Sequence, residues 1–233
     1  MSAPIAPEFR DPVMPWRLLE DFRPLSGVFD EMSSGAGQPR AHCKALIQSL
    51  EGLGRTELSS RWEGAKRAIR DNGVTYNVYG DPQGVDRPWT LDMLPLLTEP
   101  LEWGRIEGAL LQRSRLLNVI LADLYGAQRL LRDGVLPPSV VLANPSFLRP
   151  CHGVRVPNDT YVHLLAVDLG RSPDGQWRVL ADRTHAPPGA GYALGTCIVV
   201  LRRLPEEVRG GQVPRLGAFF RGPWDGVMEG WGP

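Results

Sequence analysis

The stretch YVHLLAVDLGRSPDGQWRVLADRTHAPPGAGY, from Tyr161 to Tyr192, predicts a β-hairpin followed by a glycine-rich loop. Two apolar runs, residues 162–168 and 177–182, have the composition of β-strands. Between them lies Ser172–Gly175 (SPDG), with proline in the second position and glycine in the last position of a turn. We therefore expect the two runs to pair as antiparallel strands.

Each of these runs ends on an acid, Asp168 in the first and Asp182 in the second. In an antiparallel pair both carboxylates would lie near the same end of the sheet, within reach of one cation. Magnesium is usually held by one or two carboxylates together with phosphate oxygens, so the pattern points toward a nucleotide. The alternative is that both acids are solvated turn residues paired with Arg171, Arg178 or Arg183.

The loop after the second run contains Pro187-Pro188-Gly189-Ala190-Gly191. Glycines let a backbone approach a phosphate closely, and a helix that starts there exposes N–H groups. The segment has neither the GxGxxG nor the GxxxxGK[ST] spacing. A plain loop between a strand and a helix is the alternative.

Composition limits the classes of protein to which this chain can belong. The chain has 233 residues, zero formal net charge and 22% charged residues, as is ordinary for a soluble globular chain. Neutral charge gives no argument for a nucleic-acid or membrane-surface partner. No apolar run is long enough to span a membrane. Three scattered cysteines, without CxxC spacing, predict neither a zinc site nor a disulfide framework. We expect a cytoplasmic protein.

The first half of the chain has a helical pattern. Residues 1–40 are predicted to form an irregular arm, with Ser33–Arg40 (SSGAGQPR) as a flexible linker. A helix from about residue 42 should end at Gly54, and a second should run from Thr56 to about Arg70. A strand over residues 74–79 should follow, leading to a turn at Gly80–Gly84.

The longest predicted helix covers about residues 101–125 and ends at Gly126. Its apolar stripe consists of Ile106, Leu110, Leu111, Leu117, Ile120, Leu121 and Leu124. Short elements should follow around Leu130 and in SVVLA (139–143), and residues 190–205 are predicted to be helical. Little periodicity remains beyond Arg209.

The segment RPCHGVRVP (149–157) offers two further candidates. Arg149 and Arg155 could bind an anionic group, although surface arginines are common. Cys151 and His152 are neighbours in sequence, which does not place them as nucleophile and base.

Several long segments, in the same order, resemble the circularly permuted ATP-grasp family, type 2, over about residues 28–221. They are GVTYNVYGDPQG (Gly73–Gly84), LLNVILADLYGAQRLLRDGVLPP (Leu116–Pro138), NPSFLRPCHGV (Asn144–Val154) and ADRTHAPPGAGYAL (Ala181–Leu194). The resemblance implies an α+β fold, in which a helical N-terminal half is followed by part of a mixed or antiparallel ATP-grasp sheet. Residues 41–209 would form the N-terminal part of the circularly permuted ATP-grasp domain. It also implies relatives of the glutathionylspermidine-synthetase type.

The resemblance implies ATP-dependent carboxylate–amine ligation, with ATP, Mg²⁺ and an acid and amine substrate pair as ligands. Asp168 matches the first metal-binding acid, and Val179–Arg183 (VLADR) matches the second metal-binding strand, where Asp182 is the remaining acid. Arg183, Gly189 and Gly191 are the implied nucleotide-binding residues. No catalytic residue and neither substrate can be named.

The sequence departs from the family at these positions. Many relatives read acid-x-Asn on the second strand, where this chain has Ala181 and Arg183. The resemblance stops after Gly222, so we expect an incomplete ATP-grasp fold, with a disordered tail over 210–233. One hypothesis is an ATP-dependent carboxylate–amine ligase, or its N-terminal, metal-binding half acting with a second polypeptide. The other is a truncated or degenerate, non-catalytic binding module.

Overall fold

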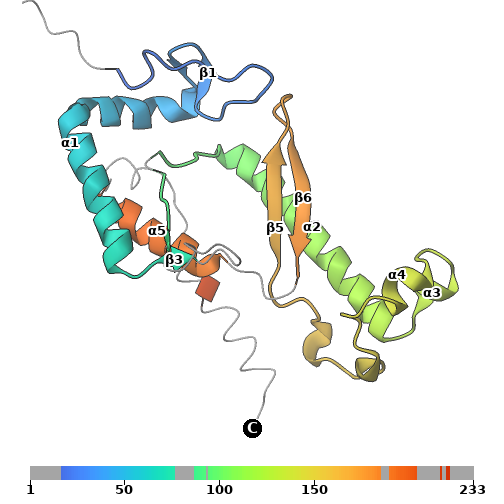
Figure 1. Cartoon of the computed structure of the whole chain (residues 1–233). Helices are drawn as coiled ribbons and strands as arrows, with labels where there is room; N and C mark the ends of the chain where they lie inside the picture. Colours follow the sequence, from blue (N-terminus) through green and yellow to red (C-terminus); the bar gives the residue numbers. More distant parts are fainter. Residues whose placement is uncertain are drawn as a thin grey trace, which may run out of the picture. The chain divides into compact units, whose positions relative to one another are not determined.

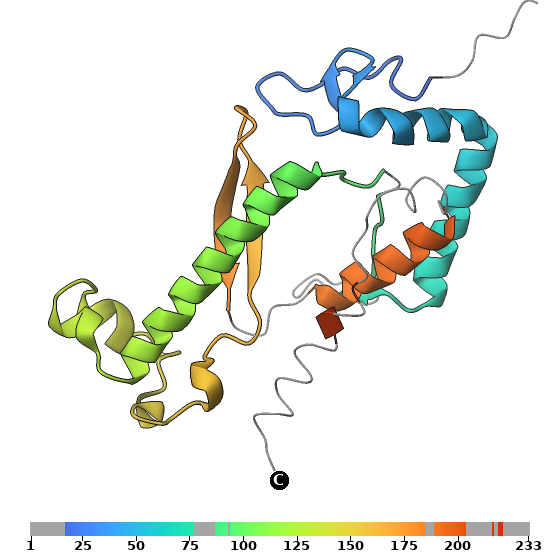
Figure 2. The ribbon, with the colours of Figure 1, turned by 180° about the vertical axis from the view of Figure 1, so that it is seen from behind.

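The computed structural model describes residues 17–76, 87–92, 94–184, 189–203, 216 and 219–220 (Figures 1 and 2). The chain divides into two compact units. Unit 1 consists of Met1–Leu97 and Gly195–Val213, and unit 2 of Thr98–Leu194 and Pro214–Pro233. Each unit combines helices with small antiparallel strand pairing, which gives the α+β composition expected from the sequence.

Unit 1 begins with a small hairpin of β1 (Ser33–Gly35) and β2 (Gln38–Pro39), joined antiparallel. The expectation of a flexible linker here was wrong. Asp30 Oδ1 accepts hydrogen bonds from the backbone N–H groups of Met32 and Ser33, at 3.0 and 2.5 Å. The buried Ser33 hydroxyl donates to the carbonyl of Gly35. Local side-chain bonds of this kind order a polar, glycine-rich segment that composition alone describes as loose.

A short 3₁₀ turn, η1 (Ala41–Cys43), leads into α1 (Lys44–Asp71). Gly54 interrupts α1 with φ +74° and ψ 160°, so the element is two helical segments joined at a kink. The second segment ends at Asn72, followed by Gly73 with φ +64°. Both predicted helices and both predicted breaks are confirmed, because glycine reaches these backbone angles without a Cβ clash.

The core of unit 1 lies along α1. Leu46, Leu50 and Leu58 form one buried cluster on this helix. A second buried cluster consists of Ala65, Ile69, Leu91 and Val199. Val199 belongs to α5 (Ala190–Arg203), which confirms the helix predicted from residue 190. The two-residue strands β3 (Thr75–Tyr76) and β4 (Arg87–Pro88) pair antiparallel beside this cluster, and the backbone N–H of Trp89 donates to the carbonyl of Val74.

Unit 2 is built on α2 (Pro100–Tyr125), which starts with proline in its first turn and ends at Gly126. This confirms the predicted helix over 101–125. A Cβ at Gly126 would lie 2.7 Å from the carbonyl oxygen of Ala122, so only glycine fits there. The short elements α3 (Arg129–Arg132), α4 (Pro138–Leu142), η2 (Arg149–Cys151) and η3 (Pro157–Asp159) follow.

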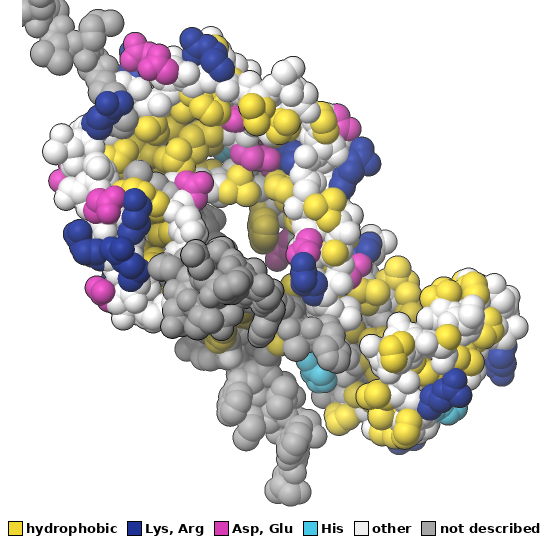
Figure 3. Space-filling model, viewed as in Figure 1, with side chains coloured by type: hydrophobic (Ala, Val, Ile, Leu, Met, Phe, Trp, Pro, Cys, Tyr) yellow, Lys and Arg dark blue, Asp and Glu magenta, His cyan; other side chains and the backbone are white. Residues whose placement is uncertain are grey.

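The apolar stripe of α2 is more exposed than its pattern suggests. Of the seven stripe residues, Ile106 and Leu124 are buried and Leu111 is exposed. Val135, Val140 and Leu148, around α3, α4 and η2, are also exposed, and Figure 3 shows apolar side chains on this surface. Fewer apolar side chains are therefore buried in the described part of unit 2 than in that of unit 1.

The predicted hairpin is confirmed as the antiparallel pair β5 (Ala166–Arg171) and β6 (Trp177–Arg183). Both views show it lying alongside α2 (Figures 1 and 2). The turn is also confirmed: Gly175, with φ +80°, donates its N–H to the carbonyl of Ser172 at 2.8 Å. The first strand differs from the expectation, since it starts at Ala166 rather than at Val162 and continues to Arg171.

Several expectations lie outside the described residues. These are the strand beyond Tyr76, the turn at Gly80–Gly84, the Pro187-Pro188 half of the loop and nearly all of the tail over 210–233. No helix in the described part of the chain is both long enough and apolar enough to cross a membrane. The cytoplasmic location stays a prediction.

We expect Gly54→Ala to lower the free energy of unfolding by about 1–3 kcal/mol, because the backbone angles of Gly54 are essentially restricted to glycine. Gly52→Ala is the matched control. Gly52 lies two residues earlier in the same helix, with open space around its Cβ position. This substitution should raise stability by about 0.5–1 kcal/mol. Urea unfolding followed by circular dichroism measures both, and equal effects would contradict the kink.

Candidate functional site

Asp168 lies on the outer face of the hairpin, the face turned away from α2. It is the cross-strand partner of Ala181, and Arg183 is two residues further along on the same face. The guanidinium of Arg183 donates from Nη2 to Asp168 Oδ2 at 2.7 Å and from Nε to the same oxygen at 3.0 Å. This hydrogen bonding lowers the pKa of Asp168 and raises the pKa of Arg183. One of the alternatives left open by the sequence, an ion pair with Arg183, is therefore confirmed for Asp168.

Asp182 lies on the opposite face, where β6 faces α2. Its cross-strand partner is Val167. Arg113 of α2 donates from Nε to Asp182 Oδ1 at 2.7 Å and from Nη2 to Oδ2 at 2.5 Å. These bonds lower the pKa of Asp182 and raise the pKa of Arg113. Arg113 is 69 residues away in sequence, and nothing in the sequence pattern singled it out.

The expectation that both carboxylates reach one cation does not hold in this register. Side chains alternate between the two faces of a strand, and the pairing places Asp168 and Asp182 on different faces. The first strand also continues past Asp168 to Arg171, so this acid is not at a strand end. Each carboxylate is already bonded to an arginine through both of its oxygens. A magnesium ion shared by the two acids does not fit this arrangement.

The described residues contain no group of three or more acidic, histidine or cysteine side chains placed to hold a metal ion. On the outer face, Ala181 offers a methyl group and Arg183 a cation. Of the three positions 168, 181 and 183 on the outer face, only Asp168 therefore carries a carboxylate.

A second arginine fastens the other end of the hairpin to α2. Arg171, at the end of β5, donates to both carboxylate oxygens of Glu102 at 2.5 and 2.9 Å. It also donates to the carbonyl of Gly175 at 2.8 Å, and its guanidinium lies 4.3 Å from the centre of the Trp177 ring. The side chain of Arg171 is 10% exposed. Charge-assisted bonds at this degree of burial position the turn firmly.

Asn118 fixes the chain just before β5, a role that the sequence pattern did not reveal. Its Oδ1 accepts from the N–H groups of Tyr161 and Val162 at 2.8 and 3.1 Å. Its Nδ2 donates to the carbonyl of Asp159 at 2.9 Å. Asn118 thus forms hydrogen bonds with three backbone groups of an irregular segment and attaches that segment to α2.

The segment 149–157 has structural contacts. Arg149 Nη2 donates to the carbonyl of Leu142 at 2.9 Å. His152 Nε2 lies 2.9 Å from the carbonyl oxygen of Gly126. These bonds join the segment to the end of α4 and the end of α2. The His152 imidazole is bonded to a backbone carbonyl and is not placed as a base beside Cys151.

Gly189 and Gly191 lie at the start of α5. Gly189 has φ +113° and accepts a hydrogen bond from the N–H of Ala193 at 2.9 Å. Both glycines have open space where a Cβ would lie. Residues 185–188, which complete the loop, are outside the described residues, so the nucleotide-binding role of the two glycines stays a prediction.

Comparison with known protein families identifies the fold to which this hairpin and helix belong. The family described as circularly permuted ATP-grasp type 2 matches residues 95–226, a range that includes α2, β5, β6 and α5. The chain belongs to this family. The match confirms the resemblance at the level of the family.

Curated relatives of this family member are similar over most of the chain. A protein of Synechocystis sp. is 35% identical over 188 residues, covering 81% of this chain and 39% of the relative. A Mycobacterium tuberculosis protein is 36% identical over 197 residues, covering 81% and 22%. A Mycobacterium leprae protein is 34% identical over 181 residues, covering 78% and 32%. All three are named as uncharacterized proteins. The chain therefore spans well under half the length of these relatives.

We expect Arg171→Met to lower the free energy of unfolding by about 1–3 kcal/mol, because it removes the largely buried guanidinium that donates to Glu102 and to the carbonyl of Gly175. Arg178→Met is the matched control on the same hairpin. Arg178 is 65% exposed and lies 3.6 Å from Asp174, so its loss should change stability by no more than about 0.5 kcal/mol. Thermal and urea unfolding measure the difference, and equal losses would contradict the anchoring role of Arg171.

The Arg113–Asp182 pair predicts a pH dependence of stability. The pKa of Asp182 is below its ordinary value of 3.8, chiefly through the hydrogen bond from Arg113. A depressed pKa contributes stability that is present in full above the unfolded-state pKa and is lost as the pH falls through the folded-state pKa. In Arg113→Gln, the loss of stability below about pH 4 should therefore be smaller than in the natural chain.

Arg115→Gln is the control for this measurement, because Arg115 is exposed on the same helix. Arg115→Gln should not change how much the free energy of unfolding falls at acidic pH. Unfolding free energies measured at intervals from neutral pH downward give the profiles. Parallel profiles for the natural chain and Arg113→Gln would count against the pair.

Proposed function

We propose that the protein represented by this chain is an ATP-dependent carboxylate–amine ligase, with relatives of the glutathionylspermidine-synthetase type. In this chemistry a carboxylate oxygen attacks the γ-phosphorus of ATP, releasing ADP and forming an acyl phosphate. An amine nitrogen then attacks the acyl carbon, loses a proton and expels inorganic phosphate to leave an amide. The single observation that supports this proposal is the family match over residues 95–226. The acid, the amine and the catalytic residues are not assigned.

We propose the outer face of the β5–β6 hairpin as the part of the ligand site that this chain contributes. Positions 168, 181 and 183 share that face. If this chain carried the acid-x-Asn pattern of the relatives that it resembles, an acid at position 181 and an amide at position 183 would lie beside Asp168. Such a group of oxygen ligands on paired strands suits Mg²⁺, which in ATP-dependent enzymes offsets charge on the phosphates. A metal-binding role for Asp182 requires a different register, one that breaks its pair with Arg113.

A non-catalytic binding module is the second candidate, and the contact between Arg183 and Asp168 favours it. The guanidinium occupies both oxygens of the one carboxylate on the outer face. A cation fixed in this place repels a metal ion. On this hypothesis the fold has kept its hairpin and helix, while this chain binds Mg²⁺-ATP weakly and transfers no phosphate. Fold alone does not carry activity, which depends on the residues at the site.

Restoring the family pattern tests the proposed site. We expect Ala181→Glu combined with Arg183→Asn to raise the affinity for Mg²⁺-ATP at least tenfold, which corresponds to about 1.4 kcal/mol. The new carboxylate and amide join Asp168 on one face, and the competing guanidinium is removed. Isothermal titration calorimetry of Mg²⁺-ATP, on the natural chain and on the double variant, measures the change. Thermal melts with and without Mg²⁺ give a second readout, because a second carboxylate opposite Asp168 needs a cation to offset the repulsion between the two.

Asp168→Asn and Asp174→Asn complete the experiment. Asp174 is an exposed acid in the turn of the same hairpin, so its loss should leave binding unchanged. Tight binding by the natural chain that Asp168→Asn abolishes would overturn the non-catalytic hypothesis. A folded double variant that gains no affinity and no Mg²⁺-dependent stability would overturn the proposed metal face.

A further inference from the structure

A groove lined by two tryptophans runs along the C-terminal half of α1, within unit 1. We call it the tryptophan groove. Its lining residues are Trp62, Lys66, Ile69, Arg70, Trp89, Thr90 and Leu91. The helical residues are spaced four and seven or eight positions from Trp62, so they share one face of α1. The other wall is the segment after β4, held by the hydrogen bond from Trp89 N–H to the carbonyl of Val74 at 2.9 Å.

The floor of the groove is apolar and its walls are aromatic. Ile69 and Leu91 are 1% and 8% exposed and belong to the buried cluster that includes Val199 of α5. Trp62 and Trp89 pack against this cluster at its edge and remain partly exposed. The exposed parts of the two indoles therefore offer planar apolar surface at the opening of the groove.

The charged residues of the lining are all cations. Lys66 Nζ lies 5.6 Å from the centre of the Trp62 ring and 2.8 Å from Glu63, outside the groove. Arg70 forms no ion pair within 4.0 Å among the residues that the structure describes. It interacts electrostatically with Glu63, whose pKa is lowered mainly by Lys66 and to a smaller extent by Arg67 and Arg70. Figure 3 shows Lys and Arg side chains over this end of α1, with Asp and Glu side chains beside them. A planar apolar surface beside a guanidinium that is in no direct ion pair is suited to a ligand that combines a ring with an anionic group.

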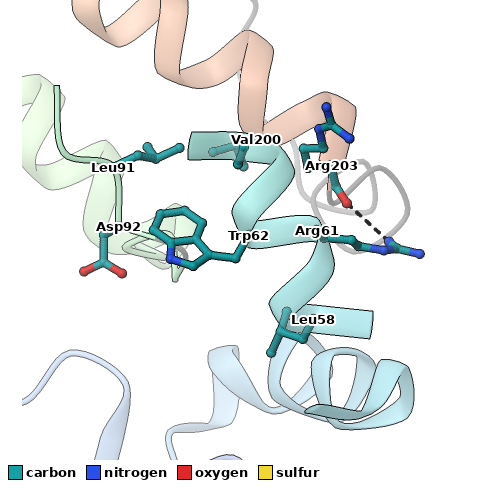
Figure 4. Close-up of a pocket in the computed structure, with 8 residues that line it drawn as sticks. Leu58, Arg61, Trp62, Leu91, Asp92, Val200 and Arg203 are labelled. Carbon is teal, nitrogen blue, oxygen red and sulfur yellow. Dashed lines mark hydrogen bonds between the residues drawn. The ribbon is translucent and has the colours of Figure 1, made fainter. Parts of the chain in front are cut away.

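An adjoining pocket extends this surface toward α5. Trp62 and Leu91 line both spaces, and Figure 4 shows the indole of Trp62 directed toward Leu91 and Asp92. On the other side, Arg61 donates to the carbonyl of Arg203 at 3.2 Å. The guanidinium of Arg203 covers Gly64, where an added Cβ would lie 3.0 Å from Nη1. These contacts join α1 to α5 next to Trp62, whose side chain packs against the buried cluster of Ala65, Ile69, Leu91 and Val199.

We propose that the tryptophan groove is a binding site for a small anion that carries a planar ring, either a carboxylate or a phosphate ester. The ring lies against the indoles of Trp62 and Trp89. The anionic group is bound by Arg70, with Lys66 contributing at longer range. The lining residues all belong to unit 1, and the proposal does not depend on the ligase activity.

The test uses the chain labelled with 5-fluorotryptophan and fluorine NMR. The chain has seven tryptophans, and Trp62→Phe and Trp89→Phe assign the two resonances of the groove. Phenylacetate and phenyl phosphate are the anionic probes. Phenylacetamide has the ring without the charge, and acetate has the charge without the ring. Both anionic probes, or one of them, should shift the Trp62 and Trp89 resonances with dissociation constants of about 1 mM, and the probe that binds more tightly identifies the anion.

Arg70→Gln should weaken binding of the anionic probe at least fivefold. Arg67→Gln removes the same charge from an exposed position on the next face of the same helix, outside the lining, and should leave binding within twofold. Both variants are at surface positions, so they keep the test valid even if a tryptophan variant fails to fold. The proposal is overturned if neither anion shifts these resonances, if phenylacetamide binds equally well, or if the two arginine variants weaken binding equally.

Discussion

Two arginine–carboxylate pairs between α2 and the β5–β6 hairpin are the contacts on which unit 2 depends. Arg113 binds Asp182 of β6, and Arg171 of β5 binds Glu102 of α2, in each case through both carboxylate oxygens. Few apolar side chains in the described part of this unit are buried, namely Ile106, Leu124 and Val141. Two-stranded hairpins are marginally stable by themselves. The bidentate pairs give the hairpin a fixed position on its helix, which hydrophobic burial alone does not supply here.

This attachment decides which side chains the hairpin presents to a ligand. Because Asp182 is turned toward α2, the alternation along β6 places Ala181 and Arg183 on the outer face with Asp168. The metal site that we propose for that face depends on three positions. In this chain Asp168 offers a carboxylate, Ala181 offers a methyl group, and Arg183 offers a guanidinium that binds the carboxylate of Asp168. In the folded chain the carboxylate of Asp168 is therefore bonded to a cationic side chain of the same hairpin.

Unit 1 is organised by burial. Its clusters lie along both segments of α1, and the kink at Gly54 allows the two segments to run in different directions. The tryptophans at the edge of the second cluster contribute to packing and also leave aromatic surface exposed beside Arg70. A side chain of this size can do both, because one edge of the indole is enough to seal a core while the other remains open.

Local patterns in the sequence determined most of the secondary structure. Glycines at 54, 73 and 126 marked helix boundaries, and the SPDG turn marked the hairpin, because these signals act within a few residues. The long matching segments also determined the family. The tertiary structure alone decided the candidate site. Whether Asp168 and Asp182 share a face depends on cross-strand register, and their actual partners differ: Arg183 is 15 residues from Asp168, whereas Arg113 is 69 residues from Asp182. Local periodicity carries no information on a contact over that distance, so packing on α2 determined which carboxylate faces outward.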